Sequence, residues 1–148
     1  MPKRAKVGDV LEVEAPHGTI YVHFVGTHPE YGDAIRVSPV LHLATPQVAD
    51  DLFDDGYVTF YPAKLAVHHG LARVVGHLAA PEMPRRFRRR GAIIGTHVKT
   101  WIIEDGSHEE LRHQLSEEEL LLPIVAIWNH AHLIESVTEG WRPEHVGR

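Results

Sequence analysis

Alternation of apolar and polar residues with a period of two constrains the fold of this chain more than any other feature of its sequence. In VLEVEA (residues 10–15), apolar residues from Leu11 onward alternate with glutamates, and TIYVHFV (residues 19–25) alternates in the same way. Successive side chains of a β-strand point to opposite faces of its sheet, so this period predicts half-buried strands. The turn at Pro16-His17-Gly18 predicts an antiparallel hairpin, and AIRV (residues 34–37) predicts the third strand of a meander.

Further strands and one break are predicted beyond this meander. Aromatic and β-branched residues, or renewed alternation, predict strands at YVTFY (57–61), LARVVGHL (71–78) and THVKTWIIEDG (96–106). The Asp105-Gly106 turn at the end of the last strand predicts another hairpin with the following HEELRHQL. Two prolines in PEMPRRFRRRG (81–91) predict a break in regular structure.

Short helices are predicted at three places and a mixed segment at a fourth. Thr45-Pro46 predicts the start of a helix in QVADDLFDD, and Gly70 closes a predicted helix in AKLAVHHG. Ser116 and Glu119 have the spacing of a capping box, which predicts a helix in SEEELLL. For IVAIWNHAHLIESVTEGW, near the end of the chain, we expect a helical turn followed by a strand rather than one continuous helix.

These elements together predict an α+β fold that is mainly β. We expect a curled antiparallel sheet or a small SH3-like barrel with a few short helices. The chain has 148 residues and no shift in composition along its length, so we expect residues 1–148 to form a single β-rich domain.

Composition and charge narrow the class of protein. Cysteine is absent, which excludes disulfides, thiolate nucleophiles and sulfur-rich zinc sites. No apolar run reaches the ~18 residues of a membrane span, and MPKRAKVGDV at the N-terminus lacks an apolar signal core, so we expect a cytoplasmic protein without a membrane partner. A net charge of −5 argues against a general nucleic-acid binder of the basic kind.

Thirteen histidines raise the question of a metal site. His68 and His69 are adjacent, so their side chains diverge by about 100° on a helix. His130 and His132 form an HxH pair on a possible strand, but no third ligand is identifiable. We therefore expect no bound metal and no cofactor.

Sequence signatures of catalysis are also missing. There is no GxSxG nucleophile motif and no glycine-rich phosphate loop of the GxxxxGK[ST] or GxGxxG type. We expect a protein that is not an enzyme.

The segment THPEYGDAIRV (27–37) has two interpretations. It supplies four polar or titratable side chains: His28, Glu30, Tyr31 and Asp33. That is enough polar chemistry for a site, but the proline and glycine between them are also what a tight loop between strands requires.

Arginines are concentrated in RRFRRR, residues 85–90. This run carries five of the fifteen lysines and arginines, with Phe87 between them. Such a cluster is typical of a patch that clamps a nucleic-acid backbone or an acidic protein. The alternative is a solvated loop after Pro84.

Acidic residues are concentrated between residues 104 and 119. The candidate partner-binding residues are Glu104, Asp105, Glu109, Glu110, Glu117, Glu118 and Glu119. A dense acidic face attracts a basic protein and speeds its docking. The alternative is an ordinary surface, because acidic residues are common at helix N-termini and hairpin tips.

Three stretches of the sequence resemble a known family. These are VGDVLEVEAPHGTIYVHFVGTHPEYGDAIRVSP, FYPAKLAVHHGLARVVG and LPIVAIWNHAHLIESVTEGWRPE. They look like the segments that recur in the immunity protein 26 family of small bacterial toxin-immunity proteins and its uncharacterised relatives. The shared pieces are strand patterns and turns rather than catalytic signatures.

This resemblance implies a compact β-rich domain that neutralises a cognate toxin by tight binding, without chemistry of its own. It also implies that residues 27–37 are a structural loop and strand, in which His28 to Asp33 shape the turn. A nucleic-acid or small-ligand binding module that uses the Arg85–Arg90 cluster remains the alternative.

Overall fold

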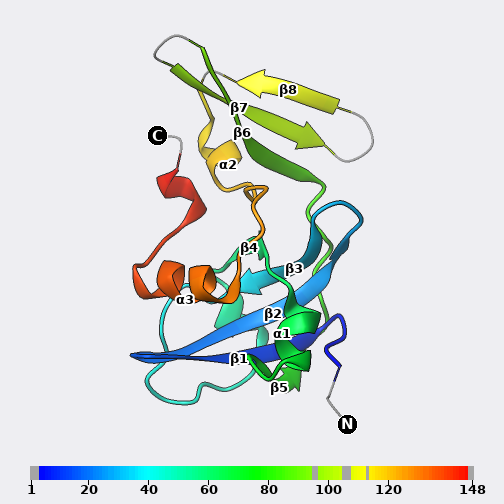
Figure 1. Ribbon diagram of the computed structural model, residues 1–148, viewed down its shortest axis with the longest axis vertical. Helices are drawn as coiled ribbons and strands as arrows, with labels where there is room; N and C mark the ends of the chain where they lie inside the picture. Colours follow the sequence, from blue (N-terminus) through cyan, green and yellow to red (C-terminus); the bar gives the residue numbers. More distant parts are fainter. Residues whose placement is uncertain (1–3, 95–96, 105–107, 113, 147–148) are drawn as a thin grey trace.

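The computed structural model describes residues 4–94, 97–104, 108–112 and 114–146, with the backbone alone at 90–94, 97–99 and 108–112. These residues form eight strands in two antiparallel sheets, three short α-helices and two 3₁₀ turns (Figure 1). The fold is therefore α+β and mainly β, as predicted. No helix in the described ranges is long and apolar enough to cross a membrane.

The larger sheet has five strands in the order β4-β3-β2-β1-β5. The strands are β1 (Asp9–Ala15), β2 (Gly18–His28), β3 (Gly32–Val37), β4 (Tyr57–Phe60) and β5 (Arg73–His77). Ala15 pairs with Gly18, so β1 and β2 are joined by a two-residue turn, and β3 continues antiparallel to β2. The predicted meander is confirmed, but β2 is not half-buried as predicted, because Tyr21 and His23 on its second face are buried too.

The smaller sheet has three strands in the order β6-β7-β8. They are β6 (Arg86–Ile94), β7 (His97–Glu104) and β8 (His108–Arg112). The predicted β7–β8 hairpin is confirmed. The predicted break is present at residues 81–85, which include both prolines. It is wrong for residues 86–91, because the arginine run from Arg86 onward is a strand that pairs with β7.

Two of the three predicted helices are present. Helix α1 (Ala63–His68) ends before Gly70, whose φ of +74° is the left-handed conformation that glycine adopts easily. Helix α2 (Glu117–Leu120) begins with the predicted capping box, in which Ser116 and Glu119 bond each other's backbone N–H groups. The predicted helix after Thr45-Pro46 is reduced to the 3₁₀ turn η1 (Asp50–Phe53), which has no side-chain cap.

The C-terminal segment differs from its prediction. Helix α3 (His130–Thr138) occupies the place where we expected a strand, and the 3₁₀ turn η2 (Pro143–His145) follows it. The Asn129 side chain caps α3 by accepting a 2.8 Å hydrogen bond from the backbone N–H of His132. Leu133 and Val137, one turn apart, are both buried in the main core, so burial of this helical face outweighs the local strand pattern.

Residues 123–128 join the two sheets (Figure 1). Arg88 of β6 donates its backbone N–H to Pro123 at 2.9 Å and accepts from Val125 at 2.8 Å, while Trp128 donates to Phe60 of β4 at 2.8 Å. The edge strands β5 and β8 do not pair with each other in the described part of the chain. The strands therefore form open sheets rather than a closed barrel.

The core lies on both faces of the larger sheet. One face packs against α1 and α3, with buried residues such as Leu11, Val22 and Leu133. The opposite face carries Val10 and Tyr21, which pack under Phe53 of η1. A third cluster contains buried residues from both sheets: Val25, Ala34, Phe60 and Phe87.

Candidate functional site

The turn between β2 and β3 is built around His28. This histidine is buried, and its ring stacks on Tyr31 with centroids 4.3 Å apart, edge-on to Phe60 and Phe87. Its Nδ1 atom accepts hydrogen bonds from the backbone N–H groups of Glu30 (3.0 Å) and Tyr31 (3.3 Å). The imidazole therefore organises the turn, as the sequence analysis predicted.

Asp33 connects the same turn to α1. Its buried carboxylate accepts hydrogen bonds from the Thr27 hydroxyl and from the backbone N–H of Lys64, each at 3.0 Å. The Lys64 ammonium lies 3.4 Å from Oδ1, the carboxylate oxygen that also accepts from Thr27. These bonds satisfy a charge that would be costly to bury alone, so Asp33 is part of the fold rather than an exposed binding group.

His23 lies under η1 on the opposite face of the larger sheet. Its Nε2–H donates to the carbonyl of Leu78 at 3.0 Å, which leaves Nδ1 to accept from Arg36 at 3.1 Å. The His23 ring stacks on Phe53, and the Arg36 guanidinium lies over the same ring. Burial lowers the pKa of His23, and the nearby Arg36 charge acts in the same direction.

The pair His130 and His132 lies on α3, not on a strand as expected. Two residues apart on a helix, their rings diverge: His130 Nδ1 accepts from the Tyr61 hydroxyl at 2.9 Å, while His132 stacks on Trp128. Burial raises the pKa of Tyr61 to about 12 and lowers that of His130. Within the described residues, no three histidines or carboxylates gather in a way that could hold a metal ion.

The arginine run is divided between the interior and the surface. Phe87 is fully buried in the cluster with Phe60, and Arg88 is only 2% exposed, whereas Arg85 and Arg89 are exposed. The Arg90 side chain lies outside the described residues. Phe87 therefore cannot stack on a nucleic-acid base, and the five arginines do not form one surface patch.

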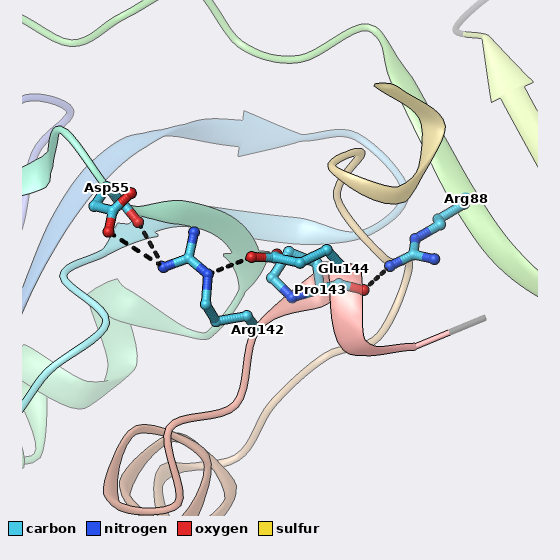
Figure 2. A network of polar contacts seen from close by, with 5 residues as sticks. All are labelled: Asp55, Arg88, Arg142, Pro143 and Glu144. Carbon is cyan, nitrogen blue, oxygen red and sulfur yellow. Dashed lines mark hydrogen bonds and ion pairs between the residues drawn. The ribbon is translucent and has the colours of Figure 1, made fainter. Parts of the chain in front are cut away.

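Arg88 connects the smaller sheet to the C-terminal segment. Its guanidinium donates to the carbonyl of Pro143 (Figure 2) and, at 2.6 Å, to that of Val146. Burial lowers the pKa of Arg88, but an arginine starts from so high a value that it keeps its charge. The sequence gives no local signal for this role, since the acceptors are 55 and 58 residues away.

Arg142 connects the same C-terminal segment to the turn before β4. It donates to the Glu144 carboxylate and, at 2.9 Å, to the carbonyl of Asp55 in the turn before β4 (Figure 2). Burial opposes ionisation of Glu144, but the hydrogen bond and charge of Arg142 lower its pKa overall. The segment around η2 is thus bonded to both sheets.

The predicted acidic face is only partly a surface in the described residues. Glu104, Glu117 and Glu118 are exposed. Glu119 is buried, and its carboxylate accepts the Ser116 backbone N–H at 2.9 Å, so it serves the helix cap. Asp105 lies outside the described residues, and so do the side chains of the two glutamates in β8, Glu109 and Glu110.

The structure places the basic and the acidic segment in one sheet. Arg86 of β6 is directly opposite Glu104 of β7, and Glu104 is opposite His108 of β8. The strand register thus brings basic and acidic positions next to each other in one sheet. The two segments are therefore not independent surfaces of opposite sign.

Two exposed apolar residues near these acids were missed by the sequence analysis. Leu121 directly follows α2 and Val146 directly follows η2, and both side chains are exposed. Leu121 belongs to the run LLL, in which an exposed position cannot be distinguished from a buried one by pattern alone.

The chain matches no protein-family model, and comparisons with curated proteins and with solved structures found no similar protein.

Proposed function

We propose that this chain is a bacterial cytoplasmic binding protein of immunity type, which neutralises a cognate toxin by direct contact and without catalysis. The observation that carries the proposal is the pair of exposed carboxylates in the first turn of α2, Glu117 and Glu118, beside the smaller sheet. They are presented on an element whose backbone is fixed by the Ser116 capping box.

Charge supports a basic partner. The chain has a net charge of −5, and exposed carboxylates raise the rate at which a positively charged protein docks. Glu117 and Glu118 are both exposed in the first turn of a capped helix, so we take these two acids as the ones that act on a partner. This narrows the predicted acidic face to α2.

The roles of the buried polar side chains also support binding over catalysis. His23, Asp33 and Arg88 each bond to the backbone or to side chains that hold the fold together. Groups used in this way support a rigid surface, which is what a tight protein–protein contact needs.

The competing proposal is a nucleic-acid or small-ligand binding module that uses Arg85–Arg90. Its support is the exposure of Arg85 and Arg89. Burial of Phe87 and Arg88 weakens it, because these two residues are the centre of the run.

Co-expression with the protein encoded by the neighbouring gene tests the proposal. We expect the chain to restore bacterial growth against that protein and to co-purify with it. Glu117→Lys with Glu118→Lys should slow association and weaken its dependence on salt, because rim charges act mainly on the association rate. The matched control is Asp51→Lys with Asp54→Lys, which makes the same charge change at exposed sites of η1 and should leave association nearly unchanged.

Two results would contradict the proposal. One is the absence of both growth rescue and a complex. The other is loss of binding in Arg85→Ser with Arg89→Ser while the α2 variant binds normally, which would move the nucleic-acid or acidic-partner alternative ahead.

A further inference from the structure

The two short elements α2 and η2 pack against each other near the smaller sheet (Figure 1). The residue directly after each element is apolar and exposed: Leu121 is 61% exposed and Val146 is 43% exposed. Single apolar residues on a surface are ordinary, but these two lie on adjoining segments that meet only in the folded chain.

Arg88 fixes the backbone beside both residues. Its N–H donates to Pro123, two residues after Leu121, and its guanidinium donates to the carbonyl of Val146 itself. Arg88 is buried, so water does not compete for these bonds. Both apolar side chains are therefore displayed on ordered backbone, and little conformational entropy remains to be lost when they are covered.

Acidic charge lies on the same side of α2 as Leu121. Glu117 and Glu118 are four and three residues before Leu121, a spacing that places side chains on one face of a helix. Both carboxylates are exposed. An apolar centre with an acidic border is complementary to a partner that presents an apolar side chain within a basic surface.

We infer that Glu117, Glu118, Leu121 and Val146, the α2–η2 surface, form a docking site for a basic protein, with the two apolar residues as anchors. A nucleic acid does not fit this site, because its phosphates would face the carboxylates. A specific interface covers about 800 Å² on each partner, so the two anchors form only its centre. The assignment deepens the proposed function and rests on it.

The test uses the isotope-labelled chain and a synthetic peptide with two leucines flanked on both sides by lysine and arginine. Titration followed by nuclear magnetic resonance should shift the backbone amides of residues 117–122 and 144–146. A second peptide, with glutamate in place of every lysine and arginine, should leave these amides unshifted.

Two double variants distinguish binding through the two apolar anchors from binding through charge alone. Leu121→Ser with Val146→Ser should weaken binding of the basic peptide about tenfold, which corresponds to losing about 1.4 kcal/mol of apolar contact. The matched control is Leu65→Ser with Leu71→Ser, which removes residues that are 58% and 47% exposed beside α1, and it should bind as the unaltered chain does. Well-dispersed spectra of both variants would show that each is folded.

The inference is overturned if the basic peptide shifts amides elsewhere, if both peptides bind alike, or if the two double variants bind equally well. Its failure differs from failure of the proposed function. Growth rescue that survives Leu121→Ser with Val146→Ser removes the docking site and keeps the toxin-neutralising role. Peptide binding that maps to the α2–η2 surface without any growth rescue keeps the docking site and removes that role.

Discussion

The two sheets of this protein are held in place in different ways. Strands β1, β2 and β3 of the larger sheet are consecutive antiparallel neighbours, and short-range bonds hold the turn between β2 and β3: His28 to Glu30, and Asp33 to Thr27. The smaller sheet is positioned by Arg88, which bonds to carbonyls 55 and 58 residues away. Local pattern thus builds the β1–β3 meander, although His23 and Asp33 also bond to the distant residues Leu78 and Lys64. The place of the smaller sheet depends on a few distant contacts alone.

Removing the Arg88 guanidinium should have the largest effect. Arg88→Met keeps much of the volume but leaves the carbonyls of Pro143 and Val146 without their donor. We expect the free energy of unfolding, measured in urea, to fall by about 3 kcal/mol. Hydrogen exchange should quicken at the amides of His145 and Val146 and in β6, while β1 to β3 stay protected.

Arg85→Met is the matched control, since Arg85 is exposed at the start of the same run. It should change stability by no more than about 0.5 kcal/mol. Equal loss of protection in both sheets after Arg88→Met would show that the two regions are not separable in the way described.

Asp33→Asn tests the local bonding of the larger sheet. Asparagine keeps the shape but loses the charge that pairs with Lys64, and its amide can accept at one oxygen where the carboxylate accepts at two. We expect a loss of about 2 kcal/mol in urea unfolding. Asp54→Asn, at an exposed site in the same region, should be nearly neutral, and a similar loss there would indicate a general charge effect.

Ser116→Ala tests the cap of α2. The hydroxyl accepts the N–H of Glu119 at 3.1 Å, and removal of such a cap costs about 1 kcal/mol. Hydrogen exchange at the Glu119 amide should quicken, with no change at β1 to β3. Loss of stability without faster exchange at Glu119 would mean that the cap does not act locally.

The smallest effect concerns pH. Burial lowers the pKa of His23 in the folded protein, so below the ordinary histidine pKa of about 6.5 the unfolded chain binds more protons and stability falls as pH falls. At pH 6 this can cost at most about 0.8 kcal/mol for one histidine. Urea unfolding at several pH values should show a shallower decline in His23→Gln.

Some decline should remain in that variant, because burial also lowers the pKa of His42 and of His130. An unchanged slope in His23→Gln would show that His23 takes up its proton equally well in both states.

The difference between the regions also explains what could be predicted from the sequence. The meander and the Ser116 capping box are short-range patterns, and both were predicted correctly. Strand β6 was missed because the arginines of its run hide any apolar alternation, and its pairing with β7 is a tertiary contact. Helix α3 was missed although signals were present: Asn129 as its cap and Gly140, with φ of +71°, just after its end.

The candidate site was predictable only in part. Glu117 and Glu118 were named from charge alone, and their exposure agrees with that choice. Glu119 was named as part of the acidic face, although the capping-box pattern that predicted α2 already assigns its carboxylate to the helix cap. Val146 could not be found from the sequence, because the contact between α2 and η2 is a tertiary one that joins segments far apart in the chain.

The hydrogen bonds of Arg88 to the carbonyls of Pro143 and Val146 can form only late in synthesis. A ribosome releases the chain from its N-terminus, so residues 9–77 provide all strands of the larger sheet early. The arginine emerges next but finds its carbonyl acceptors only after residues up to 146 have followed. Until then its charge stays in water, and the smaller sheet can pair its own strands without a fixed direction relative to β4. The surface around α2 is therefore fixed only after the strands of the larger sheet have been made, at the stage when α3 also completes the main core.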